Sequence, residues 1–564
     1  MLTGIAVSPG IAVGKVLLFS HELDMQRDHG VQGDQQAAFQ QALTASKNEL
    51  MVLRQRVSVQ TGEAAAAVFD AQMLMLDDPN LVNPVCQAID DGVDAVQAVE
   101  KTTQTLIALF AGMENCYMRE RAADIIDISR RLIRHLTGSS QLDWTEMNEP
   151  VILVAQDLTP SDTAQLDPCK VLGFATQSGG KTSHSAILAR TLEIPAVVGV
   201  PGLLAEIKGG DVIGIDGEAG EVFINPDPAV VNRLQQKAAI AARLREELAL
   251  LRDQPAITQD GHRVELAANV GHPKDIPMAL AHGAEGVGLY RTEFIFMGRT
   301  QLPDEEEQYQ AYQTVVAGMK GRPVIIRTLD VGGDKQIPYL NMPSEANPFL
   351  GWRALRMCLD RPDLFKTQLR ALWRAGCHGM LKIMFPMVSQ LAEVRLAKEL
   401  LAQAREELLS EGYQLPERIP VGVMIEIPAA ALIADQLARE VDFFSIGSND
   451  LIQYTIGVDR MNQQISRLYQ PLHPGVLRLI AMVIEAAHRQ DKWVGMCGEM
   501  AGELQCVPIL LGLGLDEFSM SSGSIPQVKH RIQTLSAENC RNLAAKCLAA
   551  GEAEEVRRFV ESLK

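Results

Sequence analysis

The residue with the clearest capacity for chemistry is His184, in the run Gly179-Gly180-Lys181-Thr182-Ser183-His184-Ser185. Two glycines free the backbone before it, small hydroxyl side chains flank it, and a helix-forming segment follows. This context predicts an imidazole at a helix N-terminus, where free N–H groups and the helix dipole favour an anion. A histidine there could carry a phosphoryl group, although the same pattern also suits a capping or buried histidine.

The residues just before His184 imitate a P-loop without completing one. Gly180-Lys181-Thr182 matches the end of the pattern Gly-x-x-x-x-Gly-Lys-[Ser/Thr], whose first glycine would stand at position 175. That position is Ala175, and Gly173 lies two residues too early. We therefore exclude a P-loop.

A second set of reactive side chains lies between residues 286 and 499, mostly just after short apolar runs. Several arginines suit a compact polyanion, because a guanidinium binds phosphate or carboxylate bidentately. The members of this set are Arg291, Arg327, Arg353, Glu426, Asn449, Asp450, Arg460 and Cys497.

Two carboxylates and a thiol in this set point to more specific chemistry. Glu426 and Asp450 suit one Mg²⁺ that also takes phosphate oxygens, and Asn449 adds an amide beside them. Cys497, as a mostly protonated thiol, could protonate an enolate left by phosphoryl loss. Each residue also has an ordinary reading, since such an arginine often forms a surface ion pair, an acid often caps a helix, and a lone cysteine is usually a small buried hydrophobe.

The elements that must position these residues form a regular pattern. Eight short apolar runs alternate with helical segments, which predicts a (β/α)8 barrel whose chemistry gathers at the C-terminal strand ends. The runs are Val264–Asn269, Gly286–Tyr290, Val324–Thr328, Lys382–Phe385, Gly422–Ile425, Phe443–Ile446, Val494–Met496 and Glu517–Met520.

The N-terminal part has a different character. Strand-like runs at 3–19 and 150–224 predict a small α/β domain that carries His184, with an Ala-, Gln- and Leu-rich helical block between them, punctuated by Pro79, Pro84 and Gly112. The expected organisation is an α/β domain at 1–20 and 145–227, a helical subdomain at 21–144, a helical linker at 228–255 and the barrel at 256–564.

Length and composition narrow the class of protein. A chain of 564 residues predicts two to four domains, and 47% hydrophobic with 22% charged residues is ordinary for a globular protein. A net charge of −18 argues against nonspecific nucleic-acid binding and is compatible with a basic protein partner. Nine scattered cysteines, no secretion signal and no membrane-length apolar run favour a reducing cytoplasm and no membrane association.

At these residues the chain resembles the Enzyme I family of the phosphoenolpyruvate-dependent sugar phosphotransferase system. The resemblance spans nearly the whole chain and rests on many motifs in one order. They include Gly4-Ile5-Ala6-Val7-Ser8-Pro9-Gly10, Leu158-Thr159-Pro160-Ser161, Gly180-Lys181-Thr182-Ser183-His184, Gly288-Leu289-Tyr290-Arg291-Thr292-Glu293-Phe294, Gly332-Gly333-Asp334-Lys335, Ile446-Gly447-Ser448-Asn449-Asp450-Leu451 and Gly495-Met496-Cys497-Gly498-Glu499.

The resemblance implies a swivelling phosphohistidine α/β domain with an inserted helical carrier-docking subdomain, and a (β/α)8 (TIM) barrel that binds phosphoenolpyruvate and dimerises. It implies that His184 takes the phosphoryl group and passes it to a histidine of an HPr-type carrier, while Cys497 protonates the enolate. The implied phosphoenolpyruvate ligands are Arg291, Arg327, Asn449, Asp450 and Arg460, the implied Mg²⁺ ligands are Glu426 and Asp450, and the supporting residues are Arg353, Thr163 and Lys335.

Two alternatives remain open at this point. One is a relative of phosphoenolpyruvate synthase or pyruvate phosphate dikinase, which would need a nucleotide-binding domain before the histidine domain; the residues before it here are largely helical. The other is a regulatory paralogue without turnover, which loss of the nucleophile, metal ligands or acid would signal. Lys181 replaces the arginine common in the family's motif, and the weaker match of the helical block leaves the identity of the carrier open.

Overall fold

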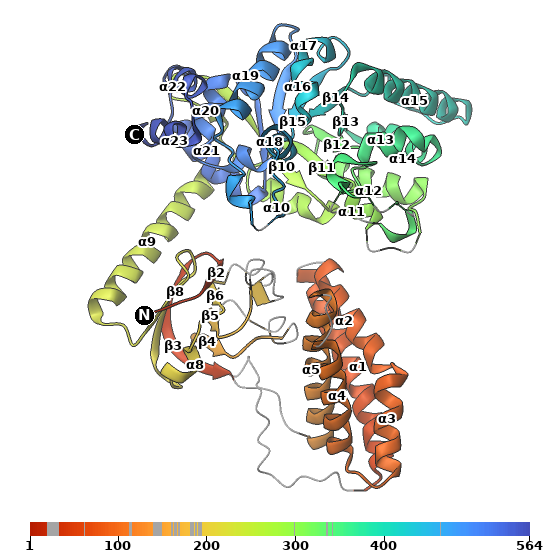
Figure 1. The fold of residues 1–564 in the computed structure, drawn as a ribbon, viewed down its shortest axis with the longest axis vertical. Helices are drawn as coiled ribbons and strands as arrows, with labels where there is room; N and C mark the ends of the chain where they lie inside the picture. The colour runs from red at the N-terminus through yellow and green to blue at the C-terminus, as the bar shows by residue number, and fades with distance from the viewer. Residues whose placement is uncertain are drawn as a thin grey trace. The chain divides into compact units, whose positions relative to one another are not determined.

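The computed structural model divides into two compact units, Met1–Leu244 and Arg245–Lys564 (Figure 1). The residues it describes are 1–19, 33–60, 63–111, 116–138, 149–159, 162, 166, 170–180, 185–186, 189, 194–297, 299, 301–333, 337–340, 342–343, 345–462 and 464–563. His184, Thr163 and Lys335 lie outside the described residues.

The first unit contains an eight-stranded mixed sheet in the order β1-β8-β7-β3-β4-β5-β6-β2. Its central strands β3 to β6 pair in parallel, and the remaining pairs are antiparallel. Apolar residues on the two faces form separate cores around Phe174 and Ile213. The strands are β1 (Leu2–Thr3), β2 (Ile5–Ser8), β3 (Ile11–Phe19), β4 (Val151–Ala155), β5 (Val171–Thr176), β6 (Ala196–Val198), β7 (Val212–Asp216) and β8 (Glu221–Ile224).

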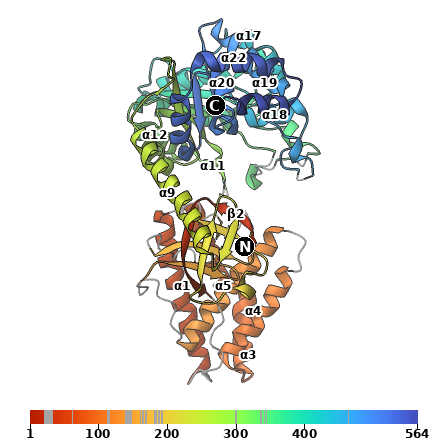
Figure 2. The same ribbon diagram turned by 90° about the vertical axis from the view of Figure 1, so that its left-hand side faces the viewer.

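A bundle of five helices interrupts this sheet in the chain. Strands β3 and β4 are paired neighbours, with Lys15 opposite Val151, and the bundle lies between them in sequence. Its helices run side by side around a core of their own (Figures 1 and 2). They are α1 (Gln35–Gln60), α2 (Glu63–Leu76), α3 (Pro79–Asp90), α4 (Ala95–Ala111) and α5 (Cys116–Thr137).

One predicted helix break is wrong. Pro79 does begin α3, where Asp78 caps the helix, but Pro84 lies inside it. The helix continues because Leu81 and Val85 are buried on one face, whereas Pro84 is exposed and the carbonyl deprived of its N–H partner can be hydrated. Tertiary burial therefore overrides the local cost of the proline.

The chain passes between the units within helix α9 (Pro228–Leu250), which covers most of the segment predicted as a helical linker. Lys237 on this helix pairs with Asp216 of β7 at 2.7 Å and with Glu218 at 3.1 Å. Leu234 is buried on the same side. The N-terminal half of α9 is thus tied to the first unit, and most of its C-terminal half is exposed.

The second unit is a closed parallel barrel, as the alternating pattern predicts. Strands β10 to β17 pair in sequence order, and β17 pairs with β10 to close the ring, while the short β9 (Ala256–Ile257) joins β10 antiparallel. The barrel strands are β10 (Arg263–Val270), β11 (Gly286–Arg291), β12 (Val324–Arg327), β13 (Leu381–Phe385), β14 (Val421–Ile425), β15 (Phe443–Ile446), β16 (Trp493–Met496) and β17 (Glu517–Met520).

Helices surround this barrel and bury one continuous apolar core against it (Figure 1). Their inward faces supply large side chains such as Phe365, Trp373 and Ile480. Within the described residues, no helix is long and apolar enough to cross a membrane. The longer helices are α12 (Glu305–Gly318), α14 (Pro362–Ala375), α15 (Leu391–Ser410), α18 (Ser448–Ile456), α19 (Pro474–His488), α21 (Ile525–Gln533), α22 (Ala537–Ala549) and α23 (Ala553–Glu561).

Candidate functional site at the barrel mouth

The predicted barrel residues meet at one cavity of about 260 Å³. It lies at the C-terminal ends of the strands, where parallel barrels gather their chemistry. Strand ends and the first turn of α18 supply most of its lining. Arg291 and Arg327 are the last residues of their strands, and Glu426 and Cys497 directly follow theirs, so apolar strands fix the positions of these four side chains. Its polar walls are Arg291, Arg327, Asp330, Arg353, Glu426, Asn449, Asp450, Arg460, Cys497 and Glu499.

Two buried arginines share one carboxylate on one side of the cavity. Arg327 ends β12 and pairs with Glu293 at 2.5 Å and with Asp330 at 2.9 Å. Arg353 reaches the other oxygen of Asp330 at 2.8 Å. The side chains of Arg327 and Arg353 are only 7% and 3% exposed, so these pairs are held in a low-dielectric setting.

The electrostatics of this pair keep both guanidinium groups charged. Burial alone would lower the pKa of Arg327, but the carboxylates of Glu293 and Asp330 outweigh burial and raise it. The pKa of Arg353 is raised in the same way by Asp330 and Asp450. Two fixed cations therefore face the cavity at any physiological pH, which suits a multiply charged anion.

Glu426 and Asp450 enter the same cavity from the ends of the neighbouring strands β14 and β15, close to the two arginines. Asp450 lies in the first turn of α18, 3.1 Å from Arg460 and 3.5 Å from Arg353. Glu426 follows β14 and accepts a hydrogen bond from the backbone N–H of Met387 at 2.6 Å. Burial and the nearby charge of Asp450 raise the pKa of Glu426.

Two further predicted ligands complete the rim. Arg291 ends β11 and lines the cavity, and among the described residues it has no carboxylate partner. Asn449 accepts a hydrogen bond from the backbone N–H of Glu499 at 2.9 Å and donates to the Glu499 carboxylate at 3.3 Å. Arg291 is thus the lining arginine whose charge the described carboxylates leave available.

Cys497 lies deeper in the same cavity, directly after β16. Its thiol is 3% exposed, and burial raises its pKa to about 11, against smaller opposing effects of Ser445 and Arg327. The Asn269 side chain donates to the Cys497 carbonyl at 2.9 Å and accepts from Ser519 at 2.7 Å, which fixes the strand end. A thiol with this pKa stays protonated at neutral pH and can serve as an acid.

The donor set fits a hard divalent cation. Glu426 and Asp450 offer carboxylate oxygens, and their proximity disfavours two uncompensated negative charges, a cost that a cation would relieve. The described residues contain no group of three or more histidine, cysteine or acidic side chains with metal-binding placement. Mg²⁺ sites commonly combine one or two protein carboxylates with substrate oxygens, so this pair of carboxylates suits such a site.

The structure also identifies mouth residues to which the sequence assigned no role. Asp330 bridges Arg327 and Arg353, and Glu293 secures Arg327 from the turn after β11. Glu293 lay within a motif noted in the sequence, and Asp330 follows β12 closely, so the available signal was position after a strand, but the partners of both residues depend on the barrel's closure. The backbone N–H of Met387, in left-handed geometry at φ 55°, had no sequence signal.

Around His184, the structure describes only neighbouring residues. β5 ends at Thr176, Gly179 adopts φ 112°, and Ser185 and Ala186 are helical and buried. Ala186 packs into the core that holds Phe174.

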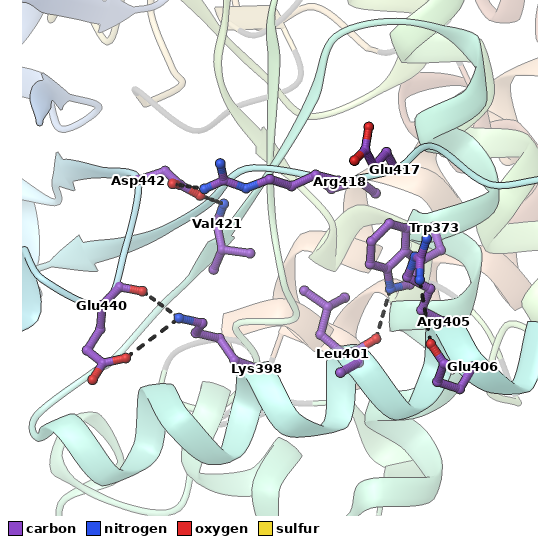
Figure 3. A pocket seen from close by; sticks show the side chains of 12 residues that line it. Trp373, Lys398, Leu401, Arg405, Glu406, Glu417, Arg418, Val421, Glu440 and Asp442 are labelled. Carbon is purple, nitrogen blue, oxygen red and sulfur yellow. Dashed lines mark hydrogen bonds and ion pairs between the residues drawn. The ribbon is translucent and has the colours of Figure 1, made fainter.

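A second cavity, of about 320 Å³, lies at the opposite ends of β14 and β15, against α15 (Figure 3). Lys398 donates to the Glu440 carbonyl at 2.6 Å, and Arg418 pairs with Asp442. Arg405 stacks over Trp373, 5.5 Å from its ring centroid. This cavity contains none of the predicted site residues.

Comparisons with known proteins identify the family of the chain. Three family models match: the phosphoenolpyruvate-binding domain of the PEP-utilising enzymes over residues 245–537, their N-terminal domain over 3–121 and their mobile domain over 147–220. The first of these alone covers more than half of the chain.

Curated relatives match along almost their whole length. The phosphoenolpyruvate-protein phosphotransferases of Bacillus sp. (strain S) and Geobacillus stearothermophilus are each 50% identical over 562 residues, covering 99% of this chain and 97% of theirs. That of Staphylococcus carnosus is 49% identical over 563 residues, covering 99% and 98%. These relatives do not favour the synthase, dikinase or regulatory alternatives. The chain belongs to the phosphoenolpyruvate-protein phosphotransferases, transferases of the PEP-utilising enzyme family.

Proposed function

We propose that this protein transfers the phosphoryl group of phosphoenolpyruvate to His184 and then to a histidine of an HPr-type carrier, as the first step of phosphotransferase-system sugar uptake. The observation that carries the proposal is the buried Arg327–Asp330–Arg353 network beside Glu426, Asp450 and Cys497 in one cavity. This arrangement supplies cations for a phosphate, carboxylates for a metal and a protonated acid.

The arginines bind and orient the substrate. Arg291, Arg327 and Arg460 would hold the phosphate and carboxylate of phosphoenolpyruvate, and Asn449 would add an amide contact. Arg353 supports them by holding Asp330 and Asp450 in place. Positioning and charge neutralisation of this kind account for most catalysis of phosphoryl transfer.

Glu426 and Asp450 would hold Mg²⁺, which neutralises phosphate charge and polarises the phosphoryl group when bound. The Met387 N–H keeps one oxygen of Glu426 occupied, which orients the carboxylate for a ligand on its other oxygen. Lys335 and Thr163 retain their predicted supporting roles, at the substrate and beside the His184 ring respectively.

Two residues of this chain, His184 and Cys497, would carry out the chemical steps. His184 Nε2 forms a bond to phosphorus while the bond from phosphorus to the enol oxygen breaks. The enolate carbon then takes the proton of the Cys497 thiol and becomes the methyl group of pyruvate. The phosphohistidine next passes its phosphoryl group to the carrier, for which the helical block at 21–144 is the proposed docking subdomain.

The remaining proposals concern the oligomeric state, the domain movement and the cellular location of the protein. We infer a homodimer through the barrel, with the α/β domain at 1–20 and 145–227 swivelling on the linker at 228–255, in the cytoplasm. Analytical ultracentrifugation of the full chain tests the dimer by its mass.

Incubation with ³²P-labelled phosphoenolpyruvate and Mg²⁺ tests the central proposal. We expect acid-labile, alkali-stable labelling that disappears in His184→Ala and persists in His262→Ala, a matched change at an exposed histidine of the second unit. Addition of an HPr-type carrier should move the label to the carrier. Labelled His184→Ala protein would contradict the assignment.

A further inference from the structure

The place from which Cys497 delivers a proton depends on its main chain. A cysteine side chain has one rotatable bond between Cα and Sγ, so the two peptide planes that flank the residue decide where the sulfur can reach. Cys497 directly follows the last residue of β16 and therefore lies just beyond the strand. Contacts from neighbouring elements must hold this segment if the thiol is to act at a fixed place.

Both main-chain polar groups of Cys497 have a partner. Its N–H donates to the carbonyl of Ile446, the last residue of β15, at 3.1 Å. Its carbonyl accepts a hydrogen bond from the Asn269 side chain at 2.9 Å. The chain then passes closely against α18, because a Cβ at Gly498 would overlap the Ser448 side chain. The two peptide planes of Cys497 are thus fixed separately, and a side chain fixes the second of them.

The amide of Asn269 is itself held in one orientation. Asn269 lies on β10, which β17 separates from β16 in the barrel, so its side chain reaches past β17 to Cys497. Its Oδ1 accepts a hydrogen bond from the Ser519 hydroxyl of β17 at 2.7 Å. A carbonyl can only accept a hydrogen bond, and Nδ2 is the donor end of the amide. The serine and the carbonyl together therefore fix which end of the amide faces the cysteine.

A glycine leaves the space that the Ser519 hydroxyl occupies. Strand β11 has one residue more than β10 beside Asn269, and Gly288 is the extra residue. Such bulges are common next to active sites, where they redirect side chains. A Cβ at Gly288 would overlap the Ser519 side chain. The same Cβ would lie 2.5 Å from Oε1 of Glu517, a buried carboxyl of β17 that also borders Gly495 of β16.

We propose that Asn269 is a positioning residue for the acid: it holds the Cys497 carbonyl and thereby directs the thiol proton to one face of the enolate. The S–H bond breaks as the C–H bond of pyruvate forms, and the thiolate then regains a proton from solvent. Asn269 neither gives nor takes a proton, and it is not among the residues that line the cavity. Ser519 supports Asn269 by orienting its amide.

The fixed position of the thiol has a chemical consequence. The enolate carbon has two faces, and a donor held at one place reaches one of them. The Cys497 side chain is almost fully buried, so solvent has little access beside it. If the Cys497 carbonyl loses its partner, the segment can shift, and a misplacement of about 1 Å costs about 10²-fold in rate.

Asn269→Leu tests the proposal, because leucine is similar in size but cannot donate to the Cys497 carbonyl. We expect pyruvate formation to fall by about 10–10²-fold. Phosphoenolpyruvate affinity in calorimetric titration should stay at the wild-type value, because Asn269 contacts none of the arginines of the mouth. Asn539→Leu, at an exposed asparagine of α22, is the matched control and should leave both quantities unchanged.

The configuration of the product separates positioning from a general loss of stability. Phosphoenolpyruvate with deuterium at one of its two C3 positions is turned over in tritiated water, and the pyruvate is trapped as lactate. The chirality of its methyl group reports which face of the enolate received the proton. Wild type should give one configuration, whereas Asn269→Leu should give a mixture. A protein that is only less stable would form less product of unchanged configuration.

Several outcomes would overturn the proposal. They are wild-type rate and configuration in Asn269→Leu, a slower variant that keeps a single configuration, and a loss of affinity equal to the loss of rate. A mixture from wild type would also overturn it, because the thiol would then have no fixed place. If Asn269→Leu does not fold, Ser519→Ala must give a smaller loss of rate with mixed configuration, and a single configuration in Ser519→Ala rejects the role of Asn269.

The inference rests on the proposed function, and the two fail separately. Labelling of wild-type His184 in the same samples tests the phosphotransfer itself. Wild-type labelling together with an unaffected Asn269→Leu variant rejects only the positioning role of Asn269.

Discussion

Two cavities of the barrel unit, the mouth and the one at the opposite strand ends, are both lined by charged side chains, but those side chains differ in how far they are buried. At the mouth, Arg327 and Arg353 are almost fully buried and share Asp330 from different elements. At the opposite strand ends, Arg418 pairs with Asp442 while 71% of its side chain is exposed (Figure 3). The two cavities are similar in volume, so size does not distinguish the site.

The difference lies in desolvation. Burying an arginine costs free energy unless carboxylates surround it. Buried, charge-paired groups of this kind cluster at functional sites. An exposed pair such as Arg418–Asp442 is screened by water and contributes little. Buried charges with fixed positions stabilise a transition state without rearrangement of the surrounding side chains or water. Solvated charges require that rearrangement.

The largest effect should follow removal of the buried charge. Arg327→Ala should lower the rate of His184 phosphorylation by about 10²–10³-fold, as loss of one preorganised donor does. It should also destabilise the barrel by about 3–5 kcal/mol, because Glu293 and Asp330 lose their partner. Rapid-quench labelling and denaturant unfolding measure the two effects. Arg327→Lys keeps the charge but loses the bidentate guanidinium geometry, so its labelling rate should lie between those of wild type and Arg327→Ala. Wild-type activity in Arg327→Ala would show that the barrel mouth is not the site of phosphoryl transfer.

The second effect concerns the acid in the same cavity. Cys497→Ala should reduce pyruvate formation by about 10²–10⁴-fold with little change in phosphoenolpyruvate affinity, because a proton donor acts mainly in the transition state. Steady-state assays and calorimetric titration separate the two. Cys506→Ala, at another buried cysteine beyond the cavity, should retain turnover. An equal loss of affinity in Cys497→Ala would instead indicate a structural thiol.

The third effect is a pH dependence of stability. The folded-state pKa of Glu517 is raised from 4.5 to about 7, so the stabilisation from its protonated form is complete below pH 4.5 and is lost as pH rises through about 7. Glu517→Gln should therefore gain Tm relative to wild type at pH 8 compared with pH 5. Differential scanning calorimetry at both values checks this, with Glu538→Gln, a change at an exposed carboxyl of α22, as the control. The same Tm difference at both pH values would mean that burial does not keep Glu517 protonated.

The smallest effect should come from the second cavity. Arg418→Ala should change stability by less than about 1 kcal/mol and leave labelling and turnover unchanged, since an exposed pair contributes little. Denaturant unfolding and the labelling assay test this beside Arg327→Ala. An activity loss comparable to that of Arg327→Ala would show that burial does not separate the two cavities.

Much of the fold was predictable because local patterns and tertiary packing agreed. Each of the eight apolar runs became a barrel strand, and strands flanking the helical block pair with each other. Pro84 shows where local rules fail, since the burial of Leu81 and Val85 carries α3 through it. The geometry at His184, Thr163 and Lys335 lies outside the described residues, so their roles stay predictions.

The sequence by itself determined which chemical groups are present and which strand each one follows, because periodicity fixes strands and motifs fix what comes next. That was enough to select Arg291, Arg327, Glu426, Asp450 and Cys497 as neighbours. Only the tertiary structure decided that Asp330 joins two arginines and that Glu517 points inward between two glycines. These contacts depend on the closure and register of the barrel strands. Closure and register bring together residues that are far apart in the sequence and determine how much solvent reaches each charged side chain.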